Sequence, residues 1–485
     1  MRTPVRQRNK LLAAGALCAA TVLGLSGLTA GGASAATPSK LTSDFNGDGY
    51  TDLAVGMPSA TVGGKAKAGY VNVVWGGEKG LGRHGSVNVS QGTSGVPGTV
   101  EAGDLFGTAV TAADFNGDGY SDLAVSAPEE AIGDTPSMGT VSVVWGSANG
   151  FTKGGITALK SGTEDTRIGR IMTAGDYDGD GTQDLVFSSQ GDEGTTTMTR
   201  PGPVTASSAT TPSLVEGYAF GAPRTYASGD LDGDGTDELV TTHKGMEVAG
   251  TRALSKASGE WKNTWRAPDY GDSLAIGDYN HDGTKDLAIG LVRPNPEADP
   301  GNTYCKDTLG GAVALVLGAK GTTLGGAAGC TTQDSPGVGG TAEAEDNFGT
   351  SLATIHDPTG DQYDALLVGN SHEAVGTAKN AGAYSYLEAS YDQPTFVGGM
   401  TTQNSDGVEG TAEAGDQFGA TVAATGFYAG RYTDYAVGAP GENADSGGVW
   451  AAWGPDDAPF EDTHSVTPAK LGLSGAVSYG SVLPR

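Results

Sequence analysis

The sequence is short of basic residues, and this shortage excludes one large class of partners. Lysine and arginine together number 28 of 485 residues, against 57 aspartates and glutamates, so the formal net charge is −29. A surface this acidic repels nucleic acid and anionic membranes, and we expect neither to be a partner. The hydrophobic fraction of 37% is too high for a disordered chain. A folded protein with this charge therefore calls for bound cations.

Cysteine is nearly absent. There are three in the chain, and Cys18 lies in an apolar N-terminal stretch. Cys305 and Cys330 remain, on either side of the strand-like run 311–318. In an oxidising compartment an even pair is typical of one disulfide, so we expect these two to be bonded.

The sequence also lacks a recognisable catalytic constellation. Its six histidines do not have zinc-type spacing, and it has no G-x-S-x-G motif. It therefore predicts no catalytic residue, and a non-enzymatic role is favoured over an enzymatic one.

Long apolar runs are limited to the N-terminus. Four basic residues within positions 2–10 precede the apolar stretch 11–28, and Ala33-Ser34-Ala35 has the small residues of a cleavage site. These features predict a signal peptide at residues 1–35, with an uncleaved membrane anchor as the alternative. We expect the mature chain, 36–485, to be secreted, extracellular and not inserted in a membrane.

Glycine is abundant instead, with 81 copies, and much of it belongs to a repeated acidic loop. Repetition at a regular period is the first feature to look for in such a chain. The five copies are DFNGDGYTD from Asp44, DFNGDGYSD from Asp114, DYDGDGTQD from Asp176, DLDGDGTDE from Asp230 and DYNHDGTKD from Asp278.

A second signal fixes the frame of the repeat. An apolar or aromatic residue followed by glycine stands eight residues before three of the loops, as in Phe106-Gly107, Ile168-Gly169 and Tyr270-Gly271, and Phe220-Gly221 stands ten before another. Two further copies keep this frame and lose the acids. Phe348-Gly349 leads by eight to His356 and by eight more to Asp364, and Phe418-Gly419 leads in the same way to Gly426 and Asp434.

Short apolar segments separated by turn residues follow each loop, as in 53–56 and 70–75. Such segments are typical of β-strands, and seven units of this kind predict an all-β fold, a seven-bladed β-propeller. GVPGTVEAGDLFG (95–107), GVGGTAEAEDNFG (337–349) and GVEGTAEAGDQFG (407–419) match position for position and support the register.

Phe-Gly before the loop, the D-x-[DN]-x-D-G-x-x-[DE] loop, and then Val-Ser-Ala-Pro (125–128) or Val-Gly-Ala-Pro (437–440) resemble the FG-GAP repeat of integrin α-subunit propellers. The resemblance covers essentially all of residues 40–485. It implies one seven-bladed propeller over 36–485, with calcium in the loops and a ligand on the opposite face. Ile168 and the acid-poor last two copies depart from the pattern.

The loops carry the oxygen donors that Ca²⁺ prefers, with side chains at positions 1, 3, 5 and 9 and a main-chain carbonyl at position 7. We expect about five structural Ca²⁺ ions. The predicted ligands are Asp44, Asn46, Asp48, Tyr50 and Asp52; Asp114, Asn116, Asp118, Tyr120 and Asp122; Asp176, Asp178, Asp180, Thr182 and Asp184; Asp230, Asp232, Asp234, Thr236 and Glu238; and Asp278, Asn280, Asp282, Thr284 and Asp286.

Two other interpretations of the loops are less favoured. An EF-hand needs a glutamate at position 12 and a following helix, whereas position 12 here is Val55, Val125, Phe187, Thr241 or Ile289 in β-type runs. Acidic turns without metal would leave three or four carboxylates repelling one another.

The two ends of the chain are complementary. The first loop has no Phe-Gly before it, and Tyr479-Gly480 near the C-terminus has no loop after it. We therefore expect the C-terminal segment to complete the first blade and close the ring.

The resemblance implies a binding function. We expect a monomeric, adhesion-type module that engages an extracellular protein or glycan. The alternative is a secreted calcium-dependent enzyme, such as a polysaccharide lyase or a phospholipase-like hydrolase, because fold alone does not decide function.

Overall fold

The structure is a computed structural model that describes most of one compact unit, Pro38–Arg485. The described residues are 42–152, 166–191, 194–205, 212–219, 221–245, 249–256, 258–269, 271–292, 304–305, 308–356, 364–389, 395–425, 434–453, 463–473 and 475–484. The predicted signal peptide, 1–35, lies outside them.

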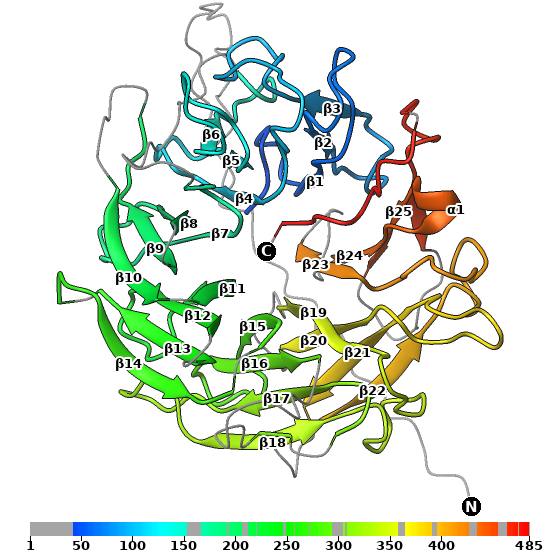
Figure 1. The fold of residues 1–485 in the computed structure, drawn as a ribbon. Coiled ribbons are helices and arrows are strands. Elements are labelled where there is room, and N and C mark those ends of the chain that lie inside the picture. The colour runs from blue at the N-terminus through cyan, green and yellow to red at the C-terminus, as the bar shows by residue number, and fades with distance from the viewer. Residues whose placement is uncertain are drawn as a thin grey trace, which may run out of the picture. The chain divides into compact units, whose positions relative to one another are not determined.

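Seven antiparallel sheets, numbered here as blades 1 to 7, make up this unit, and they follow one another around a ring (Figure 1). Blades 1 to 3 contain β1 (Leu53–Met57), β2 (Tyr70–Val74) and β3 (Ser86–Val89); β4 (Val110–Ala113), β5 (Asp122–Ala127) and β6 (Thr140–Val144); and β7 (Met172–Gly175), β8 (Asp184–Gly191), β9 (Gly194–Arg200) and β10 (Ser213–Ala219).

The other blades have four strands each. Blades 4 and 5 contain β11 (Gly221–Gly229), β12 (Glu238–Gly245), β13 (Ala249–Ser255) and β14 (Lys262–Ala267); and β15 (Ser273–Gly277), β16 (Asp286–Leu291), β17 (Ala312–Val316) and β18 (Ala327–Thr331). Blades 6 and 7 contain β19 (Phe348–Ile355), β20 (Ala365–Asn370), β21 (Ala383–Ala389) and β22 (Phe396–Thr401); and β23 (Thr421–Thr425), β24 (Asp434–Ala439), β25 (Gly448–Trp453) and β26 (His464–Val466).

Each sheet is a meander in which the strands pair in chain order. The one helical element among the described residues, α1 (Glu442–Asp445), is a single short turn. The predicted all-β, seven-bladed propeller is confirmed. None of the described helices has the length and apolar character needed to cross a membrane.

The central strands of the blades lack a polar face because neighbouring blades cover them on both sides, whereas outer strands such as β14 and β22 have a run of exposed residues. All residues of β1, β5, β17 and β24 are buried. Apolar side chains gather in seven clusters between neighbouring blades; one of them joins Phe106 and Val125 of blade 2 to Val71 of blade 1. This explains why these central strands are short continuous apolar runs rather than alternating ones.

The Phe-Gly signal marks the contact between neighbouring blades. Phe348 and Phe418 are buried, and their main chains lie directly against Gly311 and Gly382 of the preceding blade. A β-carbon on Gly382 would come within 2.2 Å of the Phe418 carbonyl oxygen, so only glycine fits there. Ile168, which departs from the motif, lies against Gly139 in the same way.

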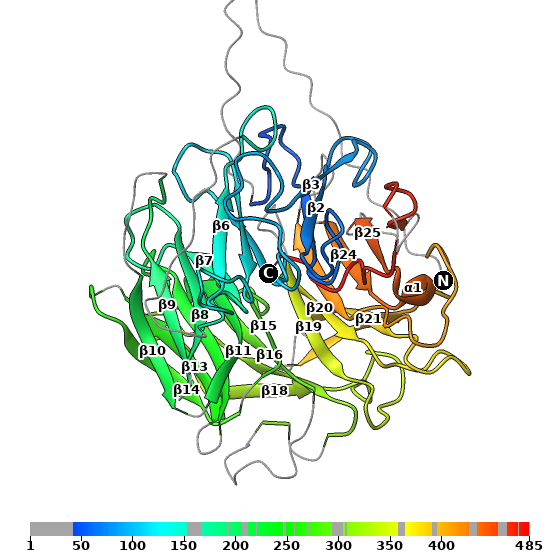
Figure 2. The ribbon, with the colours of Figure 1, turned by 45° about the horizontal axis from the view of Figure 1, so that its top comes forward.

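The C-terminal segment closes the ring. Tyr479 is buried and lies against Gly447 of blade 7, as Phe418 lies against Gly382. The N–H of Gly56 in β1 then donates to the Val482 carbonyl at 3.0 Å. In Figures 1 and 2 the red C-terminal segment runs between blades 7 and 1. The predicted pairing of the two ends is confirmed, as a single bridge rather than a long strand.

Cys305 and Cys330 form a disulfide, with their Cα atoms 5.4 Å apart. Cys330 lies in β18 opposite Ala314 of β17, so the bond ties the segment before β17 to the outer edge of blade 5.

Candidate metal centres

The acidic loops share one place in the fold. Loops 1 to 5 are residues 44–52, 114–122, 176–184, 230–238 and 278–286. In blades 2 to 5 the loop joins the first strand to the second, and the residue before position 1 pairs with position 9, as Ala113 pairs with Asp122 and Gly277 with Asp286. This pairing sets the two ends of each loop at a fixed distance, and it places the loops at one end of the ring.

The carboxylate at position 1 organises the turn. In loop 1 the Asp44 carboxylate accepts hydrogen bonds from the N–H groups of Gly47 (2.7 Å), Asp48 (3.2 Å) and Gly49 (3.0 Å). Gly49 has φ +90°, which side-chain-bearing residues rarely adopt. Bonds from positions 5 and 6 to position 1 recur in the other four loops, including loop 5, where His281 replaces the glycine of position 4.

The carboxylate at position 9 is buried and lies behind the turn. Asp52 accepts from the N–H groups of Phe45 at 3.0 Å and Gly76 at 2.9 Å. Burial raises the pKa of Asp52 to about 8; these two hydrogen bonds oppose the rise, and the charges of Asp44 and Asp48 add to it. Without a cation, the loop therefore confronts a buried carboxyl group with two nearby carboxylates.

The same burial acts in the other loops. It raises the pKa of Asp122 to about 8, of Glu238 and Asp286 to about 7, and of Asp184 to about 6. Among the described residues, one buried oxygen of Glu238 and one of Asp184 have no hydrogen-bond partner. Oxygens placed in this way, beside further acids, suit a hard cation such as Ca²⁺.

Two of the five predicted ligand sets bring three acids together in the described structure. The acidic oxygens of Asp176, Asp178 and Asp180 lie within 4.8 Å of one another, as do those of Asp230, Asp232 and Glu238. In loops 1, 2 and 5 position 3 is an asparagine, and its side-chain oxygen accepts from the N–H of position 5, at 2.8 Å in Asn46. The residue at position 7 donates its main-chain N–H to the carboxylate at position 5, as Tyr50 does to Asp48 at 3.0 Å.

The sixth copy of the loop has a different register from the one that the sequence spacing suggests. Ile355 pairs with Ala365, so Ala365 occupies position 9 and Asp364 occupies position 8. The buried ninth acid is therefore missing in blade 6. In the seventh copy Asp434 does hold position 9, opposite Thr425, while 426–433 lie outside the described residues.

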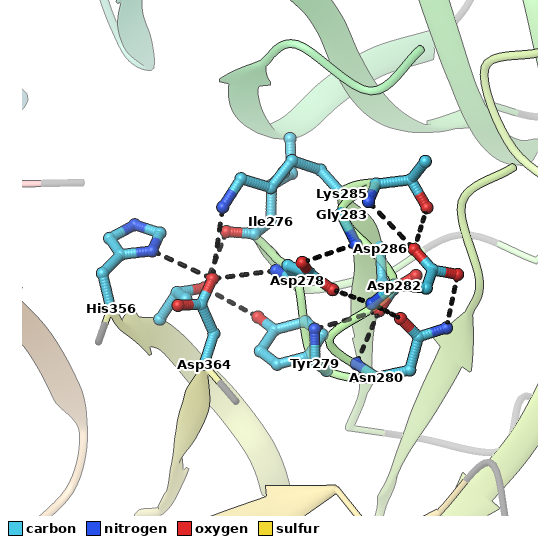
Figure 3. Close-up of polar contacts among 12 residues, drawn as sticks. Ile276, Asp278, Tyr279, Asn280, Asp282, Gly283, Lys285, Asp286, His356 and Asp364 are labelled. Atoms are coloured by element: carbon cyan, nitrogen blue, oxygen red, sulfur yellow. Dashed lines mark hydrogen bonds and ion pairs between the residues drawn. The ribbon is translucent and has the colours of Figure 1, made fainter. Parts of the chain in front are cut away.

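Asp364 lies against loop 5 of the neighbouring blade (Figure 3). Its Oδ2 accepts from the N–H of Asp278 (2.8 Å), from Nζ of Lys285 (3.3 Å) and pairs with Nδ1 of His356 (3.1 Å). Burial acts to raise the pKa of Asp364, but the hydrogen bond and charge of His356, and the charge of Lys285, hold it below its ordinary value. Lys285 thus places a positive charge beside this acid, and the Asp278 N–H and the His356 ring bind the same oxygen.

Blades 3 and 4 repeat this contact. Asp237, at position 8 of loop 4, accepts from the N–H of Asp176 at 2.9 Å and donates its own N–H to the Asp176 carbonyl at 2.8 Å. We call these two contacts, of Asp364 with Asp278 and of Asp237 with Asp176, clamps. A tyrosine stands at position 2 of the loop beside each clamp, and its hydroxyl forms a hydrogen bond with the first strand of the next blade: Tyr177 with Ser228, and Tyr279 with Thr354. In the other three loops position 2 is apolar, and so is the residue of the next blade that stands where Ser228 or Thr354 does. The pairs are Phe45 with Ala112, Phe115 with Ala174 and Leu231 with Ile276, and each pair shares one apolar cluster.

A second set of polar contacts joins blades at the opposite end of the ring. Gln91, Gln333 and Gln403 donate to Glu130, Glu373 and Glu442 of the next blade at 2.6, 2.7 and 2.7 Å. In blade 7 the strand registers place Pro468 at the position of the glutamine, and in blade 1, the next blade, Ala60 stands at the position of the glutamate. Where the glutamine is lost, its glutamate partner is therefore lost too.

The first strands of blades 2 to 7 line a central channel of about 820 Å³. Its walls are mostly small or hydroxyl-bearing, as at Thr111, Thr173 and Ser228, and His356 lies at its wall. Residues of loop 2 also border it. A separate cavity of about 210 Å³ is lined by Arg170 and Arg224.

Sequence reasoning did not identify the clamps, the glutamine–glutamate pairs or Lys256, which contacts loop 3. The glutamines stand at one position of the repeated segment, so their signal was visible, whereas the acids at position 8 are not repeated in every loop.

Two comparisons with known proteins bear on this arrangement. The FG-GAP repeat family model matches residues 41–74 and 106–144. The chain is 35% identical over 150 residues to the phosphatidylinositol-glycan-specific phospholipase D of Mus musculus, 34% over 150 residues to that of Bos taurus and 30% over 153 residues to that of Homo sapiens. Each match covers 30% of this chain and less than a fifth of the relative, 17% in the mouse protein and 18% in the other two.

Proposed function

We propose that the chain, which has FG-GAP repeats at 41–74 and 106–144 and folds into a seven-bladed propeller, is a secreted, calcium-loaded module that binds an extracellular protein or glycan. The observation that carries the proposal is that the two ends of the ring differ. One end holds the acidic loops, and the other presents connecting loops that glutamine–glutamate hydrogen bonds join to the neighbouring blade.

Calcium is supported by the donor set of each loop. Positions 1, 3, 5 and 9 supply carboxylate or amide oxygens, the main chain at position 7 lies beside them, and the ninth carboxyl is buried against repelling charges. A bound Ca²⁺ supplies the positive charge that the five loops lack and cross-links each turn to the strand behind it. The residues that hold it are the 25 predicted ligands of loops 1 to 5.

Binding is supported by the loops at the opposite end. The connections after β1, β5 and β20 share one hairpin-like form, with bridges between Val62 and Lys65, Ile132 and Thr135, and Val375 and Ala378. Glu130 and Glu373 anchor the bases of two of them to the preceding blade. Loops held on a rigid frame in this way are common binding surfaces.

Secretion is supported by the leader-like residues 1–35 and by the Cys305–Cys330 disulfide, which is typical of oxidising compartments. We propose a monomer, because the closed ring covers the inner edge of each blade and leaves only short outer edges.

The test has two parts. Metal analysis of the dialysed protein should find about five calcium ions, and extracellular proteins and glycans arrayed on a surface should bind it in calcium but not in EGTA. Two or fewer ions would contradict the calcium proposal. Calcium-independent binding at full strength, or no binding to any array, would contradict the proposed module.

A second function, hydrolysis of a phosphatidylinositol glycan, is favoured by one observation, the partial similarity to phospholipases D named for that substrate. Incubating the protein with a glycan-anchored reporter on vesicles, with and without calcium, separates the two. Calcium-dependent release of the reporter would favour the hydrolase, whereas bound but intact reporter favours the module.

A further inference from the structure

We propose that Lys256 competes with calcium in loop 3, so that this loop is the weakest of the five sites and fills only when calcium is plentiful. The inference rests on the proposed calcium function. Blade 4 has a lysine at a position where four other blades have glycine.

In blades 2, 3 and 5 a glycine follows the third strand, and in blade 1 its counterpart follows β2; this glycine donates to the acid at position 9. The N–H groups of Gly76, Gly146, Gly202 and Gly318 donate to that carboxylate at 2.7–2.9 Å. A β-carbon would collide there; on Gly146 it would lie 2.1 Å from the Ser121 carbonyl oxygen. The register of β12 and β13 puts Lys256 at this position in blade 4.

The side chain of Lys256 leaves its own blade and reaches loop 3. Its Nζ lies 2.9 Å from Oδ2 of Asp178 and 4.0 Å from Oδ2 of Asp184. The lysine side chain is 13% exposed and that of Asp184 is fully buried. That oxygen of Asp184 has no hydrogen-bond partner, so the ammonium is the nearest compensation for its charge among the described residues.

The internal hydrogen bonds of loop 3 also differ. In loops 1, 2, 4 and 5 the third side chain accepts from the N–H of position 5. In loop 3 the corresponding carboxylate, Asp178, bonds Lys256 instead, and the N–H of Asp180 bonds only Asp176 among the described partners. Position 3 is a predicted metal ligand, so the ammonium on its Oδ2 competes with a metal ion in the loop.

A lysine also contacts an aspartate across neighbouring blades at a second place in the ring. Lys285 lies on Asp364 in blade 6, where the ninth acid is lost. Loop 3 differs because it keeps all four acids, Asp176, Asp178, Asp180 and Asp184, three of which are already gathered. It therefore remains a metal site, but one from which calcium must first displace a lysine.

Calcium titration of the dialysed chain by isothermal calorimetry tests this. The wild type should show four tight sites and one weaker site. Lys256→Met should tighten the weak site by about tenfold, since a unit charge some 5 Å from a divalent ion has about that effect even at the dielectric constant of water. Lys256→Arg should keep it weak, and Lys262→Met, an exposed lysine of the same blade, should change nothing.

Asp178→Ala provides an independent variant, because it removes the oxygen donor of position 3 altogether. It should remove the weak site and leave the four tight sites unchanged. Five equal sites in the wild type, an unchanged isotherm in Lys256→Met, or loss of a tight site in Asp178→Ala would overturn the proposal. Absence of calcium binding in every variant would instead contradict the calcium function on which it rests.

Discussion

Asp364 holds Asp278 at two points across the interface between blades 5 and 6. The N–H of Asp278 donates to the Asp364 carboxylate at 2.8 Å, and the N–H of Asp364 donates to the Asp278 carbonyl at 3.2 Å (Figure 3). Asp278 is also position 1 of loop 5, whose carboxylate organises the turn. The geometry of a candidate metal loop is thus coupled to the contact between two blades.

Replacing Asp364 should therefore weaken calcium binding at a site to which it supplies no ligand. In Asp364→Asn the side chain loses its negative charge, so its contacts with Lys285 and His356 weaken. If the NH₂ group takes the place of Oδ2, it faces the N–H of Asp278, and two donors meet. We expect one calcium site to lose affinity by roughly tenfold and the calcium-free protein to lose about 1–3 kcal/mol of stability. Calorimetry and thermal melts measure the two effects. Asp406→Asn, an exposed acid, is the control; equal effects in both variants would contradict the coupling.

The repeat made most of this fold accessible from sequence. The loops, the strand after each loop and the Phe-Gly contact recur, so each copy checks the others, and even Ile168 keeps its place against Gly139. The ring closure followed in the same way, because the residues missing before loop 1 are supplied by Tyr479-Gly480.

The details that escaped prediction are those that occur between repeats. Asp364 lies at position 8 because loop 6 is one residue longer, which the spacing alone does not show. The side chain of Lys256 crosses to another blade, and no local pattern encodes where a long side chain ends. The pairing of Gln91 with Glu130 needs the arrangement of two blades, although both residues are recognisable in sequence.

Calcium removal should destabilise the whole propeller. EGTA would leave the buried ninth acids facing the acids of positions 1 and 5, and metal binding adds stability that the unfolded chain lacks. We expect the melting temperature to fall in EGTA and to recover with Ca²⁺ but poorly with Mg²⁺, which demands a tighter octahedral site. Differential scanning calorimetry measures this. An unchanged melt in protein shown to be free of metal would mean that the loops are ordinary acidic turns.

Glu130 should give the protein a measurable pH dependence away from the metal loops. Burial raises its pKa to about 7 against the hydrogen bond from Gln91, and the carboxylates of Asp104 and Glu101 add to the rise. A carboxyl group whose pKa is higher in the folded state binds more protons there. Its contribution to stability therefore falls as pH rises from about 4.5 to 7.

Glu130→Gln removes this titration and keeps an acceptor for Gln91. We expect the variant to gain roughly 1–3 kcal/mol relative to the wild type between pH 5 and pH 8. Urea unfolding at the two pH values measures the difference. Glu78→Gln, an exposed glutamate, should show none. A gain that is the same at both pH values would show that Glu130 does not titrate in this range.

The disulfide should stabilise blade 5. Cys305 and Cys330 are 25 residues apart, and the loop that they close is worth about 3 kcal/mol by chain entropy. Dithiothreitol should lower the melting temperature of the wild type to that of Cys330→Ala and leave the variant unaffected. Peptide mapping that finds two free thiols in the untreated protein would refute the bond.

The last prediction concerns the closure of the ring. The Tyr479 hydroxyl donates to Oδ1 of Asn72 at 3.0 Å, and its ring is buried in the cluster between blades 7 and 1. Tyr479→Phe should cost about 1–3 kcal/mol, because the buried Asn72 oxygen loses its donor while its amide stays bound to Ser86 and Asn88. Tyr479→Ala should cost more, about 3–5 kcal/mol, since it also opens a cavity.

Truncation after Pro468 removes this tyrosine together with Val482, the partner of Gly56. It leaves the inner edge of β1 without a neighbour, and exposed edges pair with other chains. We therefore expect the truncated protein to melt at a lower temperature than either point variant and to aggregate as its concentration rises, which light scattering during the melt would detect. The order of the three variants is the informative result. If truncation costs no more than Tyr479→Phe, the tyrosine is anchored by one hydrogen bond and the ring is not held closed by its two ends.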